Sequence, residues 1–170
     1  MTGKQAAKSL VFMIAFAACG RRGESARPPS DTAFVAMQAR GQTVMGVDQY
    51  ASAHVFEDLG DGGRIVLDAD NRSDTAGIMA IQQHMRDIAT AFRAGDFARP
   101  FRVHAQEVPG TSVMAARRTA ISYETTDRPR GAAVRIRTTD SAAVAAIHAF
   151  LAFQRTAHHA SHETMPSDPH

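Results

Sequence analysis

Residues 120–138 read AISYETTDRPRGAAVRIRT, and this stretch decides the fold. Apolar and polar side chains alternate on both sides of Pro129, which is typical of two strands that each bury one face. The segment from Asp127 to Gly131 contains the proline and glycine that favour a turn. We therefore predict a β-hairpin whose apolar face must be covered by another part of the chain.

An earlier segment repeats this pattern. Apolar-rich runs at residues 54–58 and 64–68 flank Leu59-Gly60-Asp61-Gly62-Gly63, where the glycines permit positive φ. This arrangement predicts a second β-hairpin.

A predicted helix follows each hairpin. After the first, Ser73 or Asp74 can cap a helix over about 75–94, in which apolar residues recur at helical spacing. After the second, Asp140 or Ser141 can cap a helix that extends to about residue 157. Two hairpin–helix units predict an α+β domain, with an antiparallel sheet and two main helices packed on one of its faces.

Three further segments complete the expected domain, which spans residues 42–158. We expect a short strand at residues 101–105 and an edge strand at 43–47. Pro109 and Gly110 break the chain before a loop or helical turn that carries Met114.

The N-terminus is typical of an export signal. Lys4 and Lys8 precede nine apolar residues, Leu10 to Ala18, too few to span a bilayer. Residues 1–18 therefore predict a signal peptide, residues 19–41 a flexible tether, and residues 159–170 a disordered, histidine-rich tail.

The end of the apolar run, Phe16-Ala17-Ala18-Cys19, resembles the lipobox of bacterial lipoproteins. The resemblance implies that Cys19 is lipidated and becomes the mature N-terminus, although Phe16 replaces the usual leucine. The alternative is ordinary cleavage after Ala17, which would release a soluble protein. Because an exported chain with a single cysteine cannot form an internal disulfide, lipidation is the interpretation that gives Cys19 a role.

The resemblance to lipoproteins also bears on location. We expect the domain to be anchored through its lipid to the cell envelope. In a host with two membranes, Gly20 after the cysteine resembles lipoproteins sorted to the outer membrane, with the domain on the periplasmic side.

The charge balance argues against nucleic acid as a partner. Both lysines lie in the predicted signal peptide, and the remaining 17 of the 19 basic residues are arginines that balance 17 acidic residues. A neutral, mixed surface lacks the basic stripe that binding to phosphates requires.

No familiar catalytic signature occurs in the sequence. It has neither a Walker loop nor a Gly-x-Ser-x-Gly elbow, and the acidic residues around the first hairpin lack calcium-loop spacing. His54 with Glu57 or Asp58 could form an acid–base pair, but no nucleophile accompanies them. We predict no catalytic residues and leave an enzyme as the third hypothesis.

Histidine is the unusual residue in this chain, with eight in 170. His84 and His148 lie on the flanks of the two predicted helices, and neutral imidazole is the commonest metal ligand. We take them as primary candidate ligands for copper, zinc or haem, with His54, His104 and Met114 completing the set. The alternative is that each histidine only packs and hydrogen-bonds at the edge of the core.

Helix geometry weighs against one shared site. His84 and His148 lie on opposite flanks of their apolar stripes, so they face one another only if the two helices run roughly parallel. In the tail, His158 and His162 can lie one turn apart if the second helix extends that far.

The predicted domain, from Val44 to Gln154, resembles a family of small exported bacterial proteins without settled function. The matching pieces are Asp61-Gly62-Gly63, Gln83-His84, Pro109-Gly110, Ile121-x-Tyr123, Pro129-Arg130-Gly131 and His148-x-Phe150-Leu151-x-Phe153-Gln154. Some members carry an aspartate carbamoyltransferase label. This sequence does not support that label, because it lacks the Ser-Thr-Arg-Thr carbamoyl-phosphate loop.

Two functional hypotheses follow. The first is a lipid-anchored envelope protein that binds a transition metal, foremost copper, or haem through its histidines. The second is a structural or interaction module without a bound ion, whose exposed sheet face or Pro109-Gly110 loop contacts a protein partner.

Overall fold

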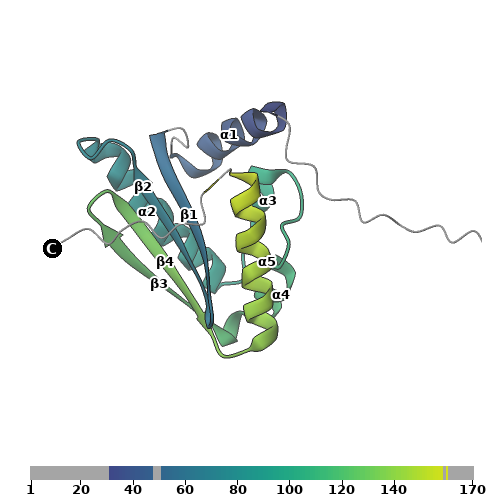
Figure 1. Ribbon diagram of the computed structural model, residues 1–170. Helices are drawn as coiled ribbons and strands as arrows, with labels where there is room; N and C mark the ends of the chain where they lie inside the picture. Colours follow the sequence, from purple (N-terminus) through teal and green to yellow (C-terminus); the bar gives the residue numbers. More distant parts are fainter. Residues whose placement is uncertain (1–30, 48–50, 159, 161–170) are drawn as a thin grey trace, which may run out of the picture.

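Two β-hairpins form one four-stranded antiparallel sheet in the order β1-β2-β4-β3. The computed structural model describes residues 31–47, 51–158 and 160 (Figure 1). The elements in chain order are α1 (Asp31–Met45), β1 (Ser52–Leu59), β2 (Gly62–Ala69), α2 (Thr75–Arg93), α3 (Ala98–His104), α4 (Thr111–Ala116), the 3-10 turn η2 (Arg118–Ala120), β3 (Ile121–Arg128), β4 (Gly131–Thr138) and α5 (Ser141–Ala157).

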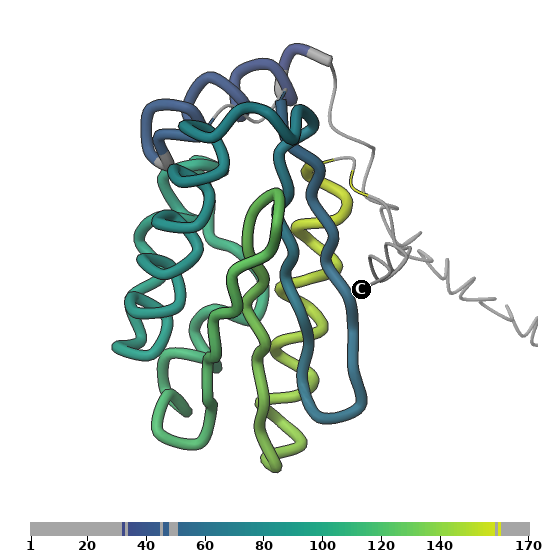
Figure 2. Tube along the Cα trace, turned by 90° about the vertical axis from the view of Figure 1, so that its left-hand side faces the viewer, coloured from purple at the N-terminus to yellow at the C-terminus, as the bar shows by residue number. Residues whose placement is uncertain are grey.

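The hairpins join through their second strands, β2 and β4, with Val66 opposite Ala133. Helices α2 and α5 both cover the same face of the sheet, α2 over β3 and β4 and α5 over β1 and β2 (Figures 1 and 2). The predicted α+β architecture of two hairpin–helix units is therefore confirmed.

Strand alternation creates the core between the sheet and the helices. Ile65, Leu67, Val134 and Ile136 point from the central strands toward the helices and are buried. The largest wholly buried side chains, Phe92 on α2 and Phe150 on α5 among them, fill the same layer.

For each long helix, the aspartate of the two predicted cap candidates is the N-cap. The side chain of Asp74 accepts a hydrogen bond from the Gly77 amide at 3.0 Å. Asp140 accepts from the amides of Ala142 and Ala143 at 2.9 and 3.1 Å. These bonds satisfy amide groups that the first helical turn leaves without partners.

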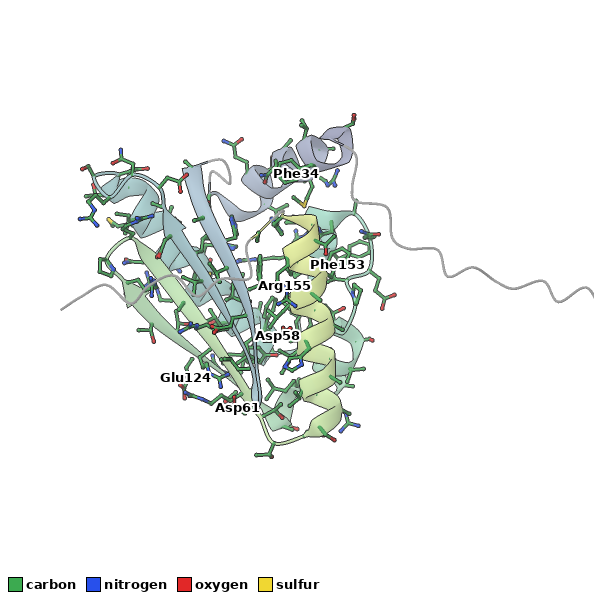
Figure 3. The ribbon with its side chains drawn as sticks, in the orientation of Figure 1. Phe34, Asp58, Asp61, Glu124, Phe153 and Arg155 are labelled. Carbon is green, nitrogen blue, oxygen red and sulfur yellow. The ribbon has the colours of Figure 1, made fainter. Side chains whose placement is uncertain are left out.

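The second face of the sheet carries ion pairs between strands. Arg64 pairs with Glu57 at 2.6 Å, Arg137 with Glu124 at 2.5 Å, and Arg135 with Asp61. Asp61 and Glu124 lie near the same end of the sheet (Figure 3). The carboxylates of this face therefore neutralise arginines on neighbouring strands.

One ion pair of this face spans three strands. Arg128 on β3 reaches Asp68 on β2 at 3.0 Å, passing over Gly131 of the intervening strand β4. A Cβ at Gly131 would lie 1.9 Å from the carbonyl oxygen of Leu67, so only glycine fits between these strands.

The predicted strand at residues 101–105 is wrong, because residues 101–104 lie in α3 and Ala105 is its C-cap. Apolar residues alternate there, but Phe101 is 54% exposed while Val103 is buried, so the alternating residues do not share one buried face. Pro100 lies in the first turn of α3, where its missing N–H costs nothing. The Asp96 side chain accepts a bond from the Ala98 amide at 2.8 Å and supports the helix start.

The predicted edge strand at 43–47 is also wrong, and the ordered domain begins earlier than expected. Residues 31–45 form α1, which crosses one end of the molecule beside α3 (Figures 1 and 2). The Arg40 Nε donates to the Val103 carbonyl at 2.8 Å. Only a few apolar residues such as Met37 face inward, which is why periodicity did not reveal this helix.

Several predictions fall outside the described residues. These are the signal peptide, Cys19, the tether up to residue 30, and all of the tail except Ala160. Within the described part, no helix is both long enough and apolar enough to cross a membrane.

Candidate ligand-binding pocket

A pocket of about 70 Å³ lies between the helices and the sheet, partly open to solvent. Strands β1 and β2 form its floor, α2 and α5 form its sides, and α3 closes one end. Its lining is mostly apolar and includes Phe56, Ile65, Met85, Phe92, Val103 and Phe150.

Four histidines from four parts of the chain line this pocket. His54 comes from β1, His84 from α2, His104 from α3, and His158 immediately follows α5. The ring centroids of His54 and His158 lie 5.2 Å apart with nearly parallel planes, at 18°. The His104 ring lies 5.2 Å from that of His158 and almost perpendicular to it. His158 therefore stands between two of the predicted candidates.

His104 is held by a buried glutamine. Its Nε2 lies 3.0 Å from Gln154 Oε1, an oxygen that only accepts, so Nε2 carries the proton and donates. The Phe153 ring packs edge-on against the imidazole at 4.9 Å. Burial lowers the pKa of His104, against the opposing effect of the bond to Gln154.

His84 is buried, and its Nδ1 has no hydrogen-bond partner among the described residues. Burial lowers the pKa of His84 to about 4, and the positive charge of Arg99 acts in the same direction. Burial also lowers the pKa of His54 to about 4. Both imidazoles are therefore neutral at neutral pH and can donate and accept hydrogen bonds at once.

Arg99, in the first turn of α3, supplies the pocket's permanent positive charge. It is the only arginine, lysine or acidic residue of the lining, and its side chain is 33% exposed. Its guanidinium lies 3.6 Å from the Asp87 carboxylate. The pocket thus carries a permanent charge on a partly exposed side chain, whereas its lining is mostly apolar.

His148, one of the two primary candidates, lies outside this pocket. Its Nε2 lies 2.9 Å from the Leu59 carbonyl oxygen and 3.0 Å from that of Gly62, so it donates to the turn between β1 and β2. The opposite flanks predicted for His84 and His148 explain the separation. His148 ties α5 to the first hairpin.

Met114 is also separate from the candidate set. It is completely buried in the core beneath α4 and does not line the pocket. A thioether at helical spacing here fills space.

The acid–base pair considered for β1 does not form. His54 and Glu57 point to opposite faces of the sheet, and Glu57 pairs with Arg64. Asp58 makes a two-pronged contact with Arg155 of α5, with bonds of 3.1 and 2.8 Å (Figure 3). These carboxylates stabilise the fold and do not reach the imidazole of His54.

No group of three or more histidine, cysteine or acidic side chains in the described part of the chain is arranged to hold a metal ion. Around His158, the His54 ring is stacked and the His104 ring is edge-on, which is the packing of aromatic neighbours.

The comparisons with known proteins place this chain in no family. No protein-family model matches it, and no curated protein or solved structure is significantly similar.

Three residues of the pocket were missed from sequence: Gln154, Arg99 and His158. Gln154 occupies an apolar position on α5, which is a signal for a buried polar partner. The role of Arg99 depends on α3, which was expected to be a strand. His158, the C-cap of α5, was considered only as a neighbour of His162 and not as a partner of His54 or His104.

Proposed function

We propose that this protein is a ligand-binding module of the bacterial cell envelope and that its pocket binds a small organic molecule with an apolar body. The observation that carries the proposal is the convergence of four imidazoles from four segments on one mostly apolar pocket. Apolar walls with a few polar groups are typical of sites that bind small molecules.

The state of the histidines supports an organic ligand. Neutral imidazoles offer directional donors and acceptors at little desolvation cost, unlike charged groups. Nδ1 of His84 is buried without a partner, and such groups cost about 1–3 kcal/mol when unsatisfied. A ligand that donates a hydrogen bond to this nitrogen would recover that cost.

Copper or zinc is the second candidate ligand. The observation that favours it is the contact of His158 with both His54 and His104, each at 5.2 Å between ring centroids. Binding would require these rings to turn until their nitrogens face one ion. The organic ligand needs no such rearrangement and is therefore the preferred proposal.

A binding experiment separates these possibilities. Amide and imidazole NMR signals would be followed while 1-hexanol, benzyl alcohol, copper and zinc are added separately to the purified protein. We expect the alcohols to shift signals of His54, His84 and His104 but not of His148. A protein that responds to neither alcohol nor metal would instead be a structural or interaction module.

A variant pair makes the test specific. His84→Leu keeps the volume of a buried side chain but removes both ring nitrogens, and we expect it to weaken binding of the alcohols. His148→Gln is the matched control, because it alters a helix histidine outside the pocket. Equal weakening by both variants would point to an effect on folding.

The envelope location is a separate part of the proposal. It depends on the signal peptide and Cys19, and labelled palmitate should enter the wild type but not Cys19→Ala. Incorporation that does not depend on Cys19, or no incorporation, would contradict a lipid anchor. A negative result on the lipid anchor would not bear on the ligand-binding pocket, which the binding experiment tests separately.

A further inference from the structure

We propose that the pocket selects a carboxylic acid: the apolar body enters between α2, α3 and α5, and the carboxylate pairs with Arg99 at the rim. This inference rests on the proposed function, since it names the class of molecule that the same pocket binds. Three observations carry it.

The first observation is the availability of the Arg99 guanidinium. The nearest carboxylate oxygen, on Asp87, lies 3.6 Å away, beyond hydrogen-bond distance. Arg155, by comparison, holds Asp58 through two bonds of 3.1 and 2.8 Å. Arg99 therefore retains the pair of N–H donors that bind a carboxylate side by side.

The second observation is the position of Arg99. It lines the pocket, and its side chain is 33% exposed, so the charge stays hydrated while its donors are within reach of a molecule in the pocket. An acid bound with its carboxylate there would leave its apolar body against Phe92, Met85 and the other walls. Such an orientation avoids burial of a charge in the apolar interior.

The third observation is the charge inventory of the lining. Arg99 is its single permanent charge, and the pKa values of His54, His84 and His104 are all lowered, which keeps them neutral. One permanent cation matches a monoanion such as a carboxylate. A phosphate ester would require more positive charge than this lining provides.

The negative charge of Asp87, next to Arg99, should oppose binding of an acid. Its carboxylate lies beside Arg99 and is 40% exposed, so it would repel an arriving acid. It also accepts a hydrogen bond from Gln83 at 2.8 Å. Replacing Asp87 by asparagine should therefore strengthen binding of an acid without changing the apolar walls.

The experiment compares hexanoate with 1-hexanol, which share an alkyl chain and differ in charge. Dissociation constants would be measured by calorimetry for the purified wild type, Arg99→Gln, Arg99→Lys and Asp87→Asn. For the wild type we expect at least tenfold tighter binding of hexanoate, and a preference that declines as salt is added.

The variants should separate charge from folding. Arg99→Gln should abolish the preference for hexanoate, because it weakens binding of hexanoate far more than binding of 1-hexanol, while Arg99→Lys should retain part of the preference. Asp87→Asn should tighten hexanoate binding severalfold.

Three results would overturn the inference. Equal wild-type affinity for the two compounds, or a preference that survives in Arg99→Gln, would refute acid selection and leave the proposed function intact. Binding of neither compound would refute both.

Discussion

The same side chain has opposite roles at two places in this molecule. His84 lies against a pocket and leaves one nitrogen unsatisfied, whereas His148 uses its Nε2 to join a helix to a turn. The difference arises from which flank of the helix each residue occupies and from what lies opposite it. At this scale, hydrogen bonding separates a candidate binding residue from a structural one.

The pocket histidines predict a stability that depends on pH. The folded pKa values of His54 and His84 are about 4, below their ordinary value of 6.5. As the pH falls below 6.5, the unfolded chain takes up these protons first, so the free energy of unfolding decreases until about pH 4. Each histidine contributes a loss of up to about 3 kcal/mol over that window.

Urea unfolding at pH 7, 6, 5 and 4 measures this dependence. His84→Leu should lose less stability than the wild type between pH 6.5 and 4, because its unfolded chain has no imidazole at position 84 to take up a proton. An identical pH profile for the two proteins would contradict the burial of a neutral His84.

His148 predicts an effect on stability without an effect on binding. His148→Ala removes the donor for the carbonyl oxygens of Leu59 and Gly62. We expect a loss of about 1–2 kcal/mol in the free energy of unfolding, measured by urea denaturation. The affinity of the pocket for 1-hexanol should stay at the wild-type value, and a large fall in affinity would contradict the separation of the two sites.

Residue chemistry made part of the candidate site predictable. His84 and His148 were the primary candidates, with His54, His104 and Met114 completing the set. Of these, His54, His84 and His104 line one pocket, and His148 and Met114 do not. Their partners were not predictable, because the contact of His104 with Gln154 joins residues 50 positions apart. Such pairing depends on how the helices pack, which the sequence periodicity does not specify.

At the scale of elements, close strand contact depends on glycine. A Cβ at Gly131 would clash with the Leu67 carbonyl oxygen, whereas one at Gly60 would meet nothing within 4 Å. We therefore expect Gly131→Ala to cost about 3 kcal/mol or more. Gly60→Ala, in the turn of the first hairpin, should change stability far less.

Thermal unfolding of the two variants is the measurement, with the wild type beside them. Comparable midpoints for Gly131→Ala and Gly60→Ala would show that β2 and β4 can separate enough to accept a side chain. That result would also weaken the account of how Arg128 reaches Asp68 across β4.

Elements with local signals were predicted well, and those without them were not. Hairpins and long helices carry their turns, caps and periodicity within a few residues, as at Asp74 and Asp140. Helix α3 is short, and its apolar residues alternate as they would in a strand. Packing against neighbouring elements decides which of its side chains are buried, and periodicity does not reveal this. Helix α1 has too few inward apolar residues for its amphipathic pattern to be visible.

The whole molecule is expected to open unevenly. Strands β2 and β4 are hydrogen-bonded on both sides, whereas α1 packs mainly against α3 at one end. We predict that amides of β2 and β4 exchange with solvent only through global unfolding, while those of α1 exchange through local opening. Hydrogen exchange in increasing urea tests this, and equal protection of α1 and β4 would contradict it.

The walls of the pocket come from five elements, and this affects how fast the protein is degraded in its host. Segments so far apart in the chain form a binding site only after the entire domain has folded, so the unfolded polypeptide does not bind the ligand. Any compound that occupies the site must then shift the folding equilibrium, by about 2.7 kcal/mol at a hundredfold excess over its dissociation constant. Cells that supply the compound should degrade this protein more slowly than cells deprived of it.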